Sequence, residues 1–192
     1  MKSMSPELRS RIPSRLHHHN YTTLDHEKTR AFYEDLLGFP LVAFWTEIEP
    51  LPQNDGKDVI MGHAFYGLGD GSMLAFMHFA DPEFAERMKA PTQPMGIHLA
   101  LAVTRELQAA TVEKLRGAGV PVMEIDHGFV RSIYFTDPNG LRVEFASDPD
   151  NVDEIYGEQA DSAHATMRQY LAGDHRKTNR WLPEMHEAPT YR

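Results

Sequence analysis

A chain of 192 residues suits one globular domain or two fused small modules, and its 41% of hydrophobic residues is enough for a sizeable core. The net charge of −9 argues against nucleic acid as a partner, because phosphate binding needs an excess of cations. The absence of cysteine excludes disulfides, thiolate zinc sites and cysteine nucleophiles.

The sequence also lacks the signals of a membrane protein. No apolar run approaches the roughly 18 residues of a membrane-spanning helix. The N-terminus carries charge but no apolar core of a secretory signal. Together with the missing cysteines, this fits a reducing cytoplasm, where we expect the protein. Any metal must be held by carboxylates and by some of the 11 histidines.

The first recurring pattern begins with a strand-like segment headed by a histidine triplet, and a helix follows it. The helix is predicted by apolar spacing at Thr29, Phe32, Tyr33, Leu36 and Leu37. It stops at Gly38, a residue type favoured for a left-handed helix C-cap, and Pro40 comes two residues later. Strand-like runs then cover residues 41–48, 63–68 and 72–79, and the turn GDG joins the last two as a hairpin.

The same order returns after a linker at residues 81–96, which has a short helix and three prolines. A strand headed by His98 leads into a helix with apolar positions at Leu107, Ala110, Val112 and Leu115. This helix stops at Gly119, again two residues before a proline. Strand-like runs cover residues 120–125, 130–136 and 141–146, with the strong turn sequence DPNG between the last two. The recurrence predicts an α+β chain of two homologous βαβββ modules, at about residues 15–80 and 95–147.

Residues 148–192 are more polar and are predicted to form a C-terminal helical extension. A helix is expected near residues 159–171, ending at Gly173. Its apolar positions, Ala163, Met167, Tyr170 and Leu171, make one stripe. The stripe favours a helix packed across the sheet or against a subunit neighbour, as in a homodimer. A lid over an active site is the alternative.

Three candidate metal ligands come from three different strands. In a strand, alternate side chains share a face. His18 then lies with Asn20, His98 with two alanines, and Glu144 with Arg142, each on the more polar or roomier face of its strand. A pairing of the two modules would bring His18 and His98 to matching positions across one cavity. Two histidines and one carboxylate leave open positions on a metal, an arrangement typical of non-haem Fe(II) oxygenases, although Mn(II), Zn(II) and Ni(II) also suit these ligands.

Structural roles compete with these assignments. A single strand histidine is more often hydrogen bonded in the fold than bound to metal. His17 and His19 are also rivals of His18, because a shift of one residue in the strand register exchanges the faces.

The first module resembles the vicinal oxygen chelate superfamily, which contains glyoxalases, bleomycin- and fosfomycin-resistance proteins and type I extradiol dioxygenases. The resemblance rests on the spacing of His18, Asp25, Phe32, Tyr33, Leu37, Gly38 and Phe39. It covers about residues 15–147 and picks His18 from the triplet. It implies paired βαβββ modules that form a curved mixed sheet around a metal-binding cavity.

A second stretch is similar to the signature of extradiol ring-cleaving dioxygenases. The matching residues of IDHGFVRSIYFTDPNGLRVE are His127, Ile133, Tyr134, Asp137, Pro138, Gly140 and Glu144. The resemblance implies that His18, His98 and Glu144 hold the metal, most simply Fe(II). It implies that His127 and Tyr134 face a substrate that binds beside O2.

This sequence departs from the extradiol pattern at one position. Extradiol enzymes carry another acid–base histidine at the start of the last strand of the first module, where this chain has GDGS. His63, one strand earlier, and His78, later in the same strand, are the nearest replacements, and His63 joins His127 and Tyr134 as a candidate catalytic residue.

Three functions follow as hypotheses. The first is an Fe(II)-dependent dioxygenase that acts on a catechol-like or other bidentate oxygen substrate. The second is a glyoxalase-like isomerase or a resistance-type transferase of the same superfamily. The third is a non-catalytic protein that binds an aromatic small molecule.

Overall fold

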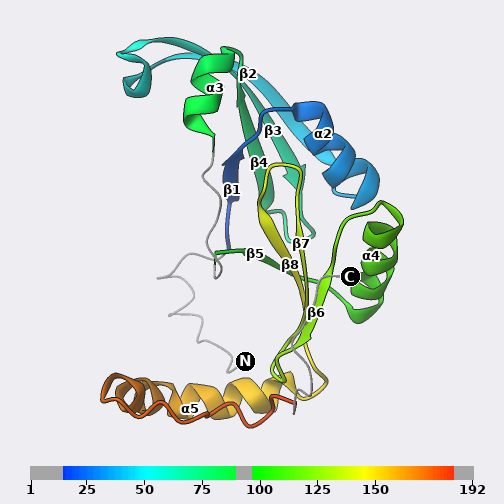
Figure 1. The fold of residues 1–192 in the computed structure, drawn as a ribbon, viewed down its shortest axis with the longest axis vertical. Helices are drawn as coiled ribbons and strands as arrows, with labels where there is room; N and C mark the ends of the chain where they lie inside the picture. The colour runs from blue at the N-terminus through cyan, green and yellow to red at the C-terminus, as the bar shows by residue number, and fades with distance from the viewer. Residues whose placement is uncertain (1–14, 90–96, 184–192) are drawn as a thin grey trace. The chain divides into compact units, whose positions relative to one another are not determined.

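The computed structural model describes residues 15–89 and 97–183, and these residues fall into two compact units (Figure 1). The N-terminal unit contains the described residues up to His98 together with Thr136–Arg142. The C-terminal unit contains Leu99–Phe135 and the described residues from Val143 onward. Each unit is built around one four-stranded mixed sheet.

The N-terminal unit has the expected strand–helix–three-strand order. Its sheet has the strand order β1-β4-β3-β2, in which β1 runs parallel to β4 and the other neighbours are antiparallel. Its elements are β1 (His18–Thr22), α2 (His26–Arg30) with a π-helical continuation (Ala31–Leu36), β2 (Leu41–Leu51), a 3-10 turn (Pro52–Asn54), β3 (Lys57–Gly67), β4 (Met73–Phe79) and α3 (Pro82–Met88).

The predicted helix stop is confirmed, but two strands are longer than predicted. Gly38 adopts φ +83°, a left-handed conformation that glycine takes without steric cost. The predicted strand 41–48 continues to Leu51, and its partner already begins at Lys57, since the two pair along their whole length. Pro50 made this extension difficult to predict from the sequence. β2 is an edge strand, where a proline without an N–H donor is tolerated.

The core of the N-terminal unit lies on both faces of its sheet. On one face, Tyr33, Tyr66 and Phe76 are at most 1% exposed, and the Tyr33 and Phe76 ring centroids are 4.9 Å apart. On the other face, α3 packs against β3 and β4 through the buried residues Val59, Met61, Phe79, Phe84 and Ala85.

A hydrogen bond joins this core to the DPNG turn. The Tyr33 hydroxyl donates to Asp137 Oδ2 at 3.0 Å, and both residues are buried. Asp137 Oδ1 also accepts from the backbone N–H groups of Asn139 (2.8 Å) and Leu141 (2.7 Å). Burial raises the pKa of the Asp137 carboxyl, and these hydrogen bonds offset only part of that shift.

The Tyr33→Phe variant should therefore lose stability, because the buried Asp137 carboxyl loses a donor. The expected loss in the free energy of unfolding is about 1–3 kcal/mol, measured by urea unfolding at pH 7. The matched control is Tyr170→Phe at a 62%-exposed site, which should change stability by less than about 0.5 kcal/mol. Equal stability of the Tyr33→Phe and control proteins would contradict this role.

The C-terminal unit repeats the order of the first. Its sheet has the strand order β5-β8-β7-β6, in which β5 runs parallel to β8 and β6 antiparallel to β7. Its elements are β5 (Leu99–Ala102), α4 (Arg105–Gly117), β6 (Met123–Asp126), β7 (Arg131–Thr136), β8 (Arg142–Ser147) and α5 (Val152–Leu171). The prediction of two βαβββ modules in an α+β fold is thus confirmed.

Helix α4 is fixed to one face of its sheet. Thr104 caps the helix by accepting from Leu107 N at 3.2 Å, and the Gln108 amide donates to the Phe145 carbonyl at 2.8 Å. The most deeply buried apolar side chains of this unit are at most 2% exposed: Leu115, Val122, Ile133, Phe135, Val143, Phe145 and Ile155. Gly119 adopts φ +73°, so the second predicted helix stop is also confirmed.

Helix α5 begins at Val152, several residues before the predicted start, and its second half is largely exposed. Met167, Tyr170 and Leu171 of the predicted apolar stripe are 55%, 62% and 74% exposed. The homodimer and the lid, which were predicted from this stripe, both remain predictions.

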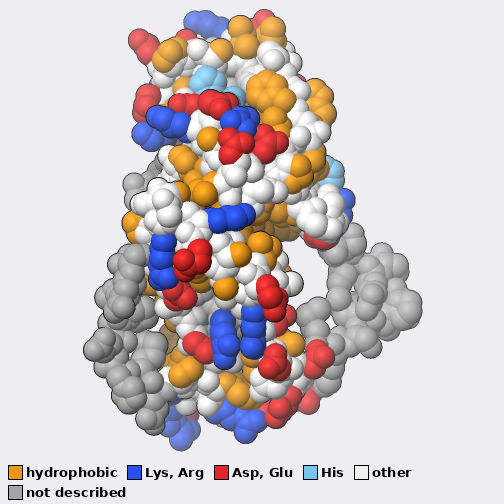
Figure 2. All heavy atoms as spheres, turned by 90° about the vertical axis from the view of Figure 1, so that its right-hand side faces the viewer, with side chains coloured by type: hydrophobic (Ala, Val, Ile, Leu, Met, Phe, Trp, Pro, Cys, Tyr) orange, Lys and Arg blue, Asp and Glu red, His pale blue; other side chains and the backbone are white. Residues whose placement is uncertain are grey.

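The surface around α2 is charged and solvated. Figure 2 shows acidic and basic side chains next to each other on the face that carries this helix. Arg30 pairs there with Glu27 and Asp35, both at 2.7 Å. Among the described residues, no helix is both long and apolar enough to cross a membrane.

Candidate metal and catalytic site

The structure separates the members of the histidine triplet by sheet face. The His18 ring lies 5.6 Å from that of Phe65, whereas the His19 ring lies 4.4 Å from Tyr21, which in turn contacts the core residue Phe76. His18 therefore points to the face opposite the core of α2. Its Nδ1 lies 2.9 Å from Nδ1 of His17.

His63 lies on the same sheet face as His18. Its Nε2 is 2.9 Å from Asn20 Oδ1, and its Nδ1 is 3.5 Å from the Glu47 carboxylate. Its ring lies 4.3 Å from that of Phe65, the ring that His18 also contacts. Burial lowers the pKa of His63, while the Glu47 carboxylate acts in the opposite direction.

His78, the other replacement considered for the missing acid–base histidine, points the opposite way. Its neighbour Met77 pairs with His63, so alternation turns His78 to the face of α2. There its ring lies 5.6 Å from that of His26. Of the two replacements, His63 shares the face of His18.

Glu144 lies in the middle of the second sheet, on β8 between β5 and β7. It is 4% exposed, and the Ser132 hydroxyl donates to its carboxylate. Its register partner on β5 is Ala100, whose small side chain leaves room beside the carboxylate. His98, the residue before β5, is exposed.

His127 and Tyr134 form a direct pair. His127 Nε2 lies 3.0 Å from the Tyr134 hydroxyl, and the rings meet edge to face. Tyr134 is two residues after Ser132 on β7, so both share the face of Glu144. The loop that carries His127 is fixed by His127 N donating to the Val130 carbonyl at 2.9 Å, and by Gly128 N donating to Asp126 at 2.8 Å.

The predicted site residues are shared between the two units. His18, His63 and His98 belong to the N-terminal unit, and His127, Tyr134 and Glu144 belong to the C-terminal unit. Within either unit, residues 15–89 and 97–183 contain no group of three or more histidine, aspartate or glutamate side chains that could hold a metal ion. The ligand set of His18, His98 and Glu144 remains a prediction.

Among the described residues, sequence reasoning missed three that contact the candidate site residues. Ser132 could have been found, because alternation places it with Tyr134. Glu47 depends on the register between β2 and β3, which the sequence does not reveal. The Asn179 amide donates to the His127 carbonyl at 2.9 Å, over a separation of 52 residues, and no sequence pattern indicates this contact.

Two βαβββ modules, with imidazole and carboxylate side chains on the sheet faces described above, define a paired-module α+β protein. The family model of the Glyoxalase/Bleomycin resistance protein/Dioxygenase superfamily matches residues 15–145. The chain belongs to this superfamily, as the sequence motifs predicted. No curated protein matches the chain.

Solved structures share the fold at low sequence identity. FosX, the fosfomycin resistance protein of Listeria monocytogenes, is 18% identical with a TM-score of 0.53, and the match covers 73% of this chain and 98% of that chain. A mutant of FosX, complexed with Mn(II) and 1S,2S-dihydroxypropylphosphonic acid, is 19% identical with a TM-score of 0.51, covering 70% of this chain and 92% of that one. The oxidase ChaP-H2 is 20% identical with a TM-score of 0.46, covering 70% and 94%. At these identities the likeness to the two FosX structures shows the fold alone.

Proposed function

We propose that the protein is an Fe(II)-dependent, extradiol-type dioxygenase that acts on a catechol-like or other bidentate oxygen substrate. The observation that carries this proposal is the 3.0 Å contact between His127 and Tyr134 on the sheet face of the buried Glu144. An acid–base pair beside a candidate metal ligand is what ring cleavage requires. A protein that only binds its ligand has no need for such a pair.

The donor set fits a divalent metal. His18 and His98 supply imidazole nitrogen, and Glu144 supplies a carboxylate that a nearby cation would stabilise in its buried position. Ser132 would orient this carboxylate from behind, as outer hydrogen-bond partners of metal ligands do. When bound, Fe(II) would supply the Lewis acidity and the redox chemistry that O2 requires, while Mn(II), Zn(II) or Ni(II) would fit the same ligands.

Side chains of the protein would carry out the proton transfers. The Tyr134 hydroxyl can donate to a substrate oxygen, and His127 Nε2, in contact with that hydroxyl, can hold or return its proton. His63, on the face of His18, would serve as the second acid–base group in place of the histidine that is missing at GDGS.

The test is an O2-uptake screen over catechols with protein loaded anaerobically with Fe(II), together with metal analysis. Uptake that depends on iron, with loss of the catechol ring absorbance, supports the proposal. Loaded metal without uptake on any catechol would favour the isomerase or transferase alternative. Failure to retain any divalent metal would favour the binding protein.

The pH dependence of kcat/KM is expected to follow the protonation of His63. Burial lowers its pKa below the ordinary value of 6.5, so its imidazole is neutral at pH 7 and becomes protonated only as the pH falls through the lowered pKa. The acid limb of kcat/KM is therefore expected to have a midpoint below pH 6.5 and to vanish in His63→Gln. Glu47→Gln should move this midpoint to still lower pH, because the Glu47 carboxylate favours the charged imidazole.

His164→Gln, a change at an exposed histidine of α5, is the control and should leave the profile unchanged. A limb that persists in His63→Gln would assign it to another group.

A further inference from the structure

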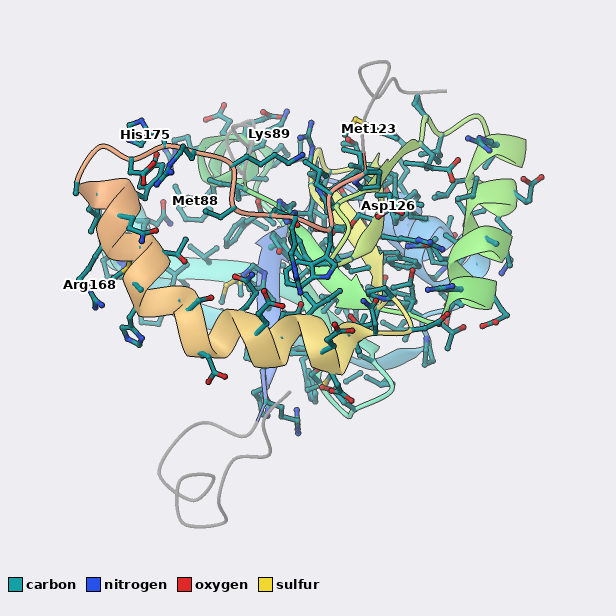
Figure 3. The ribbon with its side chains drawn as sticks, turned by 90° about the horizontal axis from the view of Figure 1, so that it is seen from below. Met88, Lys89, Met123, Asp126, Arg168 and His175 are labelled. Carbon is teal, nitrogen blue, oxygen red and sulfur yellow. The ribbon has the colours of Figure 1, made fainter. Side chains whose placement is uncertain are left out.

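The C-terminal unit contains a cavity that the proposed chemistry does not use. It has a volume of about 240 Å³ and lies between α5, the chain segment after it and Phe129. The segment after α5 turns back along the helix: Figure 3 shows it leading from His175 toward Asp126 at the end of β6. Of the described residues that line the cavity, Phe129 alone falls within the family match at residues 15–145. The cavity is therefore built mainly by the C-terminal extension of this chain.

Four contacts hold the C-terminal segment beside the cavity. Asn179 donates from its amide to the His127 carbonyl at 2.9 Å and accepts from Trp181 N at 3.2 Å. Arg180 forms an ion pair with Glu158 on α5, and its guanidinium carbon lies 4.7 Å from the centre of the Trp181 ring.

Gly128 allows the backbone of the C-terminal segment to lie close against the His127 loop. A Cβ at this position would lie 2.2 Å from the Trp181 carbonyl carbon, and its φ of +79° also disfavours other residues. The C-terminal segment is thus fitted against the loop that carries His127.

The lining defines the chemistry of an occupant. Phe129, Tyr156 and Trp181 supply aromatic surface, and the fully buried Ile155 supplies aliphatic surface. Among the described residues, no charged side chain lines the cavity. Phe129 and Tyr156 are each 39% exposed, so an apolar occupant would remove their rings from water.

The polar atoms and the volume of the cavity restrict its occupant further. Within the described chain, neither the Gln159 amide nor the Thr178 hydroxyl has a hydrogen-bond partner, so both are available to an occupant. A cavity of roughly 150 Å³ holds benzene, and this one is larger. A neutral aromatic ring with a polar substituent matches both the volume and the lining.

We propose that this cavity is a binding site for a neutral, planar aromatic group, built by the C-terminal extension beside the His127 loop. The group has two sources. It is either a separate aromatic ligand or a ring substituent of the substrate on which His127 and Tyr134 act. Phe129 links the cavity to His127, since their ring centroids are 6.0 Å apart. Only the assignment to a ring substituent of the substrate rests on the proposed function.

The test uses nitrobenzene, a neutral ring with acceptor oxygens that cannot chelate a metal as a catechol does. The full chain is titrated without metal. Trp45 and Trp181 are the two tryptophans, so in Trp45→Phe the fluorescence reports Trp181 alone. Saturable quenching is expected with a Kd on the order of 1 mM or tighter. In Trp181→Phe, where Trp45 alone emits, quenching should not saturate.

Variants in the Trp45→Phe background test whether the nitrobenzene ring binds in the cavity. Tyr156→Ala should raise the Kd about tenfold, because it removes one aromatic wall. Gln159→Phe should abolish binding by filling the cavity from its rim, and it leaves Trp181 as the single tryptophan. Tyr170→Ala is the matched control on the same helix and should bind normally, since Tyr170 does not line the cavity.

Absence of saturable quenching in the Trp45→Phe protein overturns the proposal. An unchanged Kd in folded Gln159→Phe protein also overturns it, and this variant decides the matter if Tyr156→Ala fails to fold. Once a substrate is turned over, inhibition kinetics identify the source. A raised KM with unchanged kcat in nitrobenzene assigns the cavity to the substrate's ring, whereas an unchanged KM assigns it to a separate ligand. Binding without any turnover would support the cavity while contradicting the proposed dioxygenase.

Discussion

The Glu144→Gln variant is expected to fold normally and to lose its metal. Glutamine has nearly the same shape and can still accept the hydrogen bond from Ser132, but it removes the negative charge of the predicted ligand set. Loss of an outer hydrogen-bond partner costs about 10–100-fold in metal affinity, so loss of the carboxylate itself should cost more than about 100-fold. Metal content after dialysis against a fixed free-metal concentration measures the effect, and turnover should fall with occupancy.

The control for this variant is Glu113→Gln, which makes the same charge change at an exposed position of α4. It should bind metal like the wild type. His18→Ala and His98→Ala should resemble Glu144→Gln. Full metal occupancy in the Glu144→Gln protein would remove this residue from the ligand set.

The second large effect is expected at the His127–Tyr134 pair. Tyr134→Phe keeps the ring but deletes the hydroxyl that lies 3.0 Å from His127 Nε2. Loss of one such charge-assisted hydrogen bond in the transition state is worth about 1.5–3 kcal/mol, a ten- to hundredfold fall in kcat. His127→Ala should cost at least as much, because general acid–base catalysis typically contributes about 10²–10⁴-fold.

Steady-state O2 uptake at equal iron occupancy measures both variants of the pair. His164→Ala and Tyr170→Phe make matched changes at exposed positions of α5 and should retain full activity. His127→Ala preserves the backbone carbonyl that accepts from Asn179, so the C-terminal segment should stay in place. Unchanged rates in both variants would reduce the pair to a structural contact and favour the isomerase or the binding protein.

Local patterns in the sequence determined the order of the elements. Gly38 and Gly119 end their helices in left-handed conformations, because few other residues adopt a positive φ at low cost. The repeat of helix, glycine and proline predicted two βαβββ modules. The short separation across the DPNG turn also placed His127, Tyr134 and Glu144 on one hairpin and its entry loop, where strand alternation fixes their faces.

Only the tertiary structure decided which distant residues meet. The face of His18 rather than His19, and of His63 rather than His78, follows from strand pairing, which a shift of one residue would reverse. The length of the β2–β3 hairpin was hidden by Pro50, whose position at a sheet edge is a property of the assembled sheet. The contact of Asn179 with His127 and the cavity beside it depend on a chain reversal after α5. Periodicity describes neighbours within a turn or a strand, whereas these contacts are selected by the packing of segments far apart in the chain.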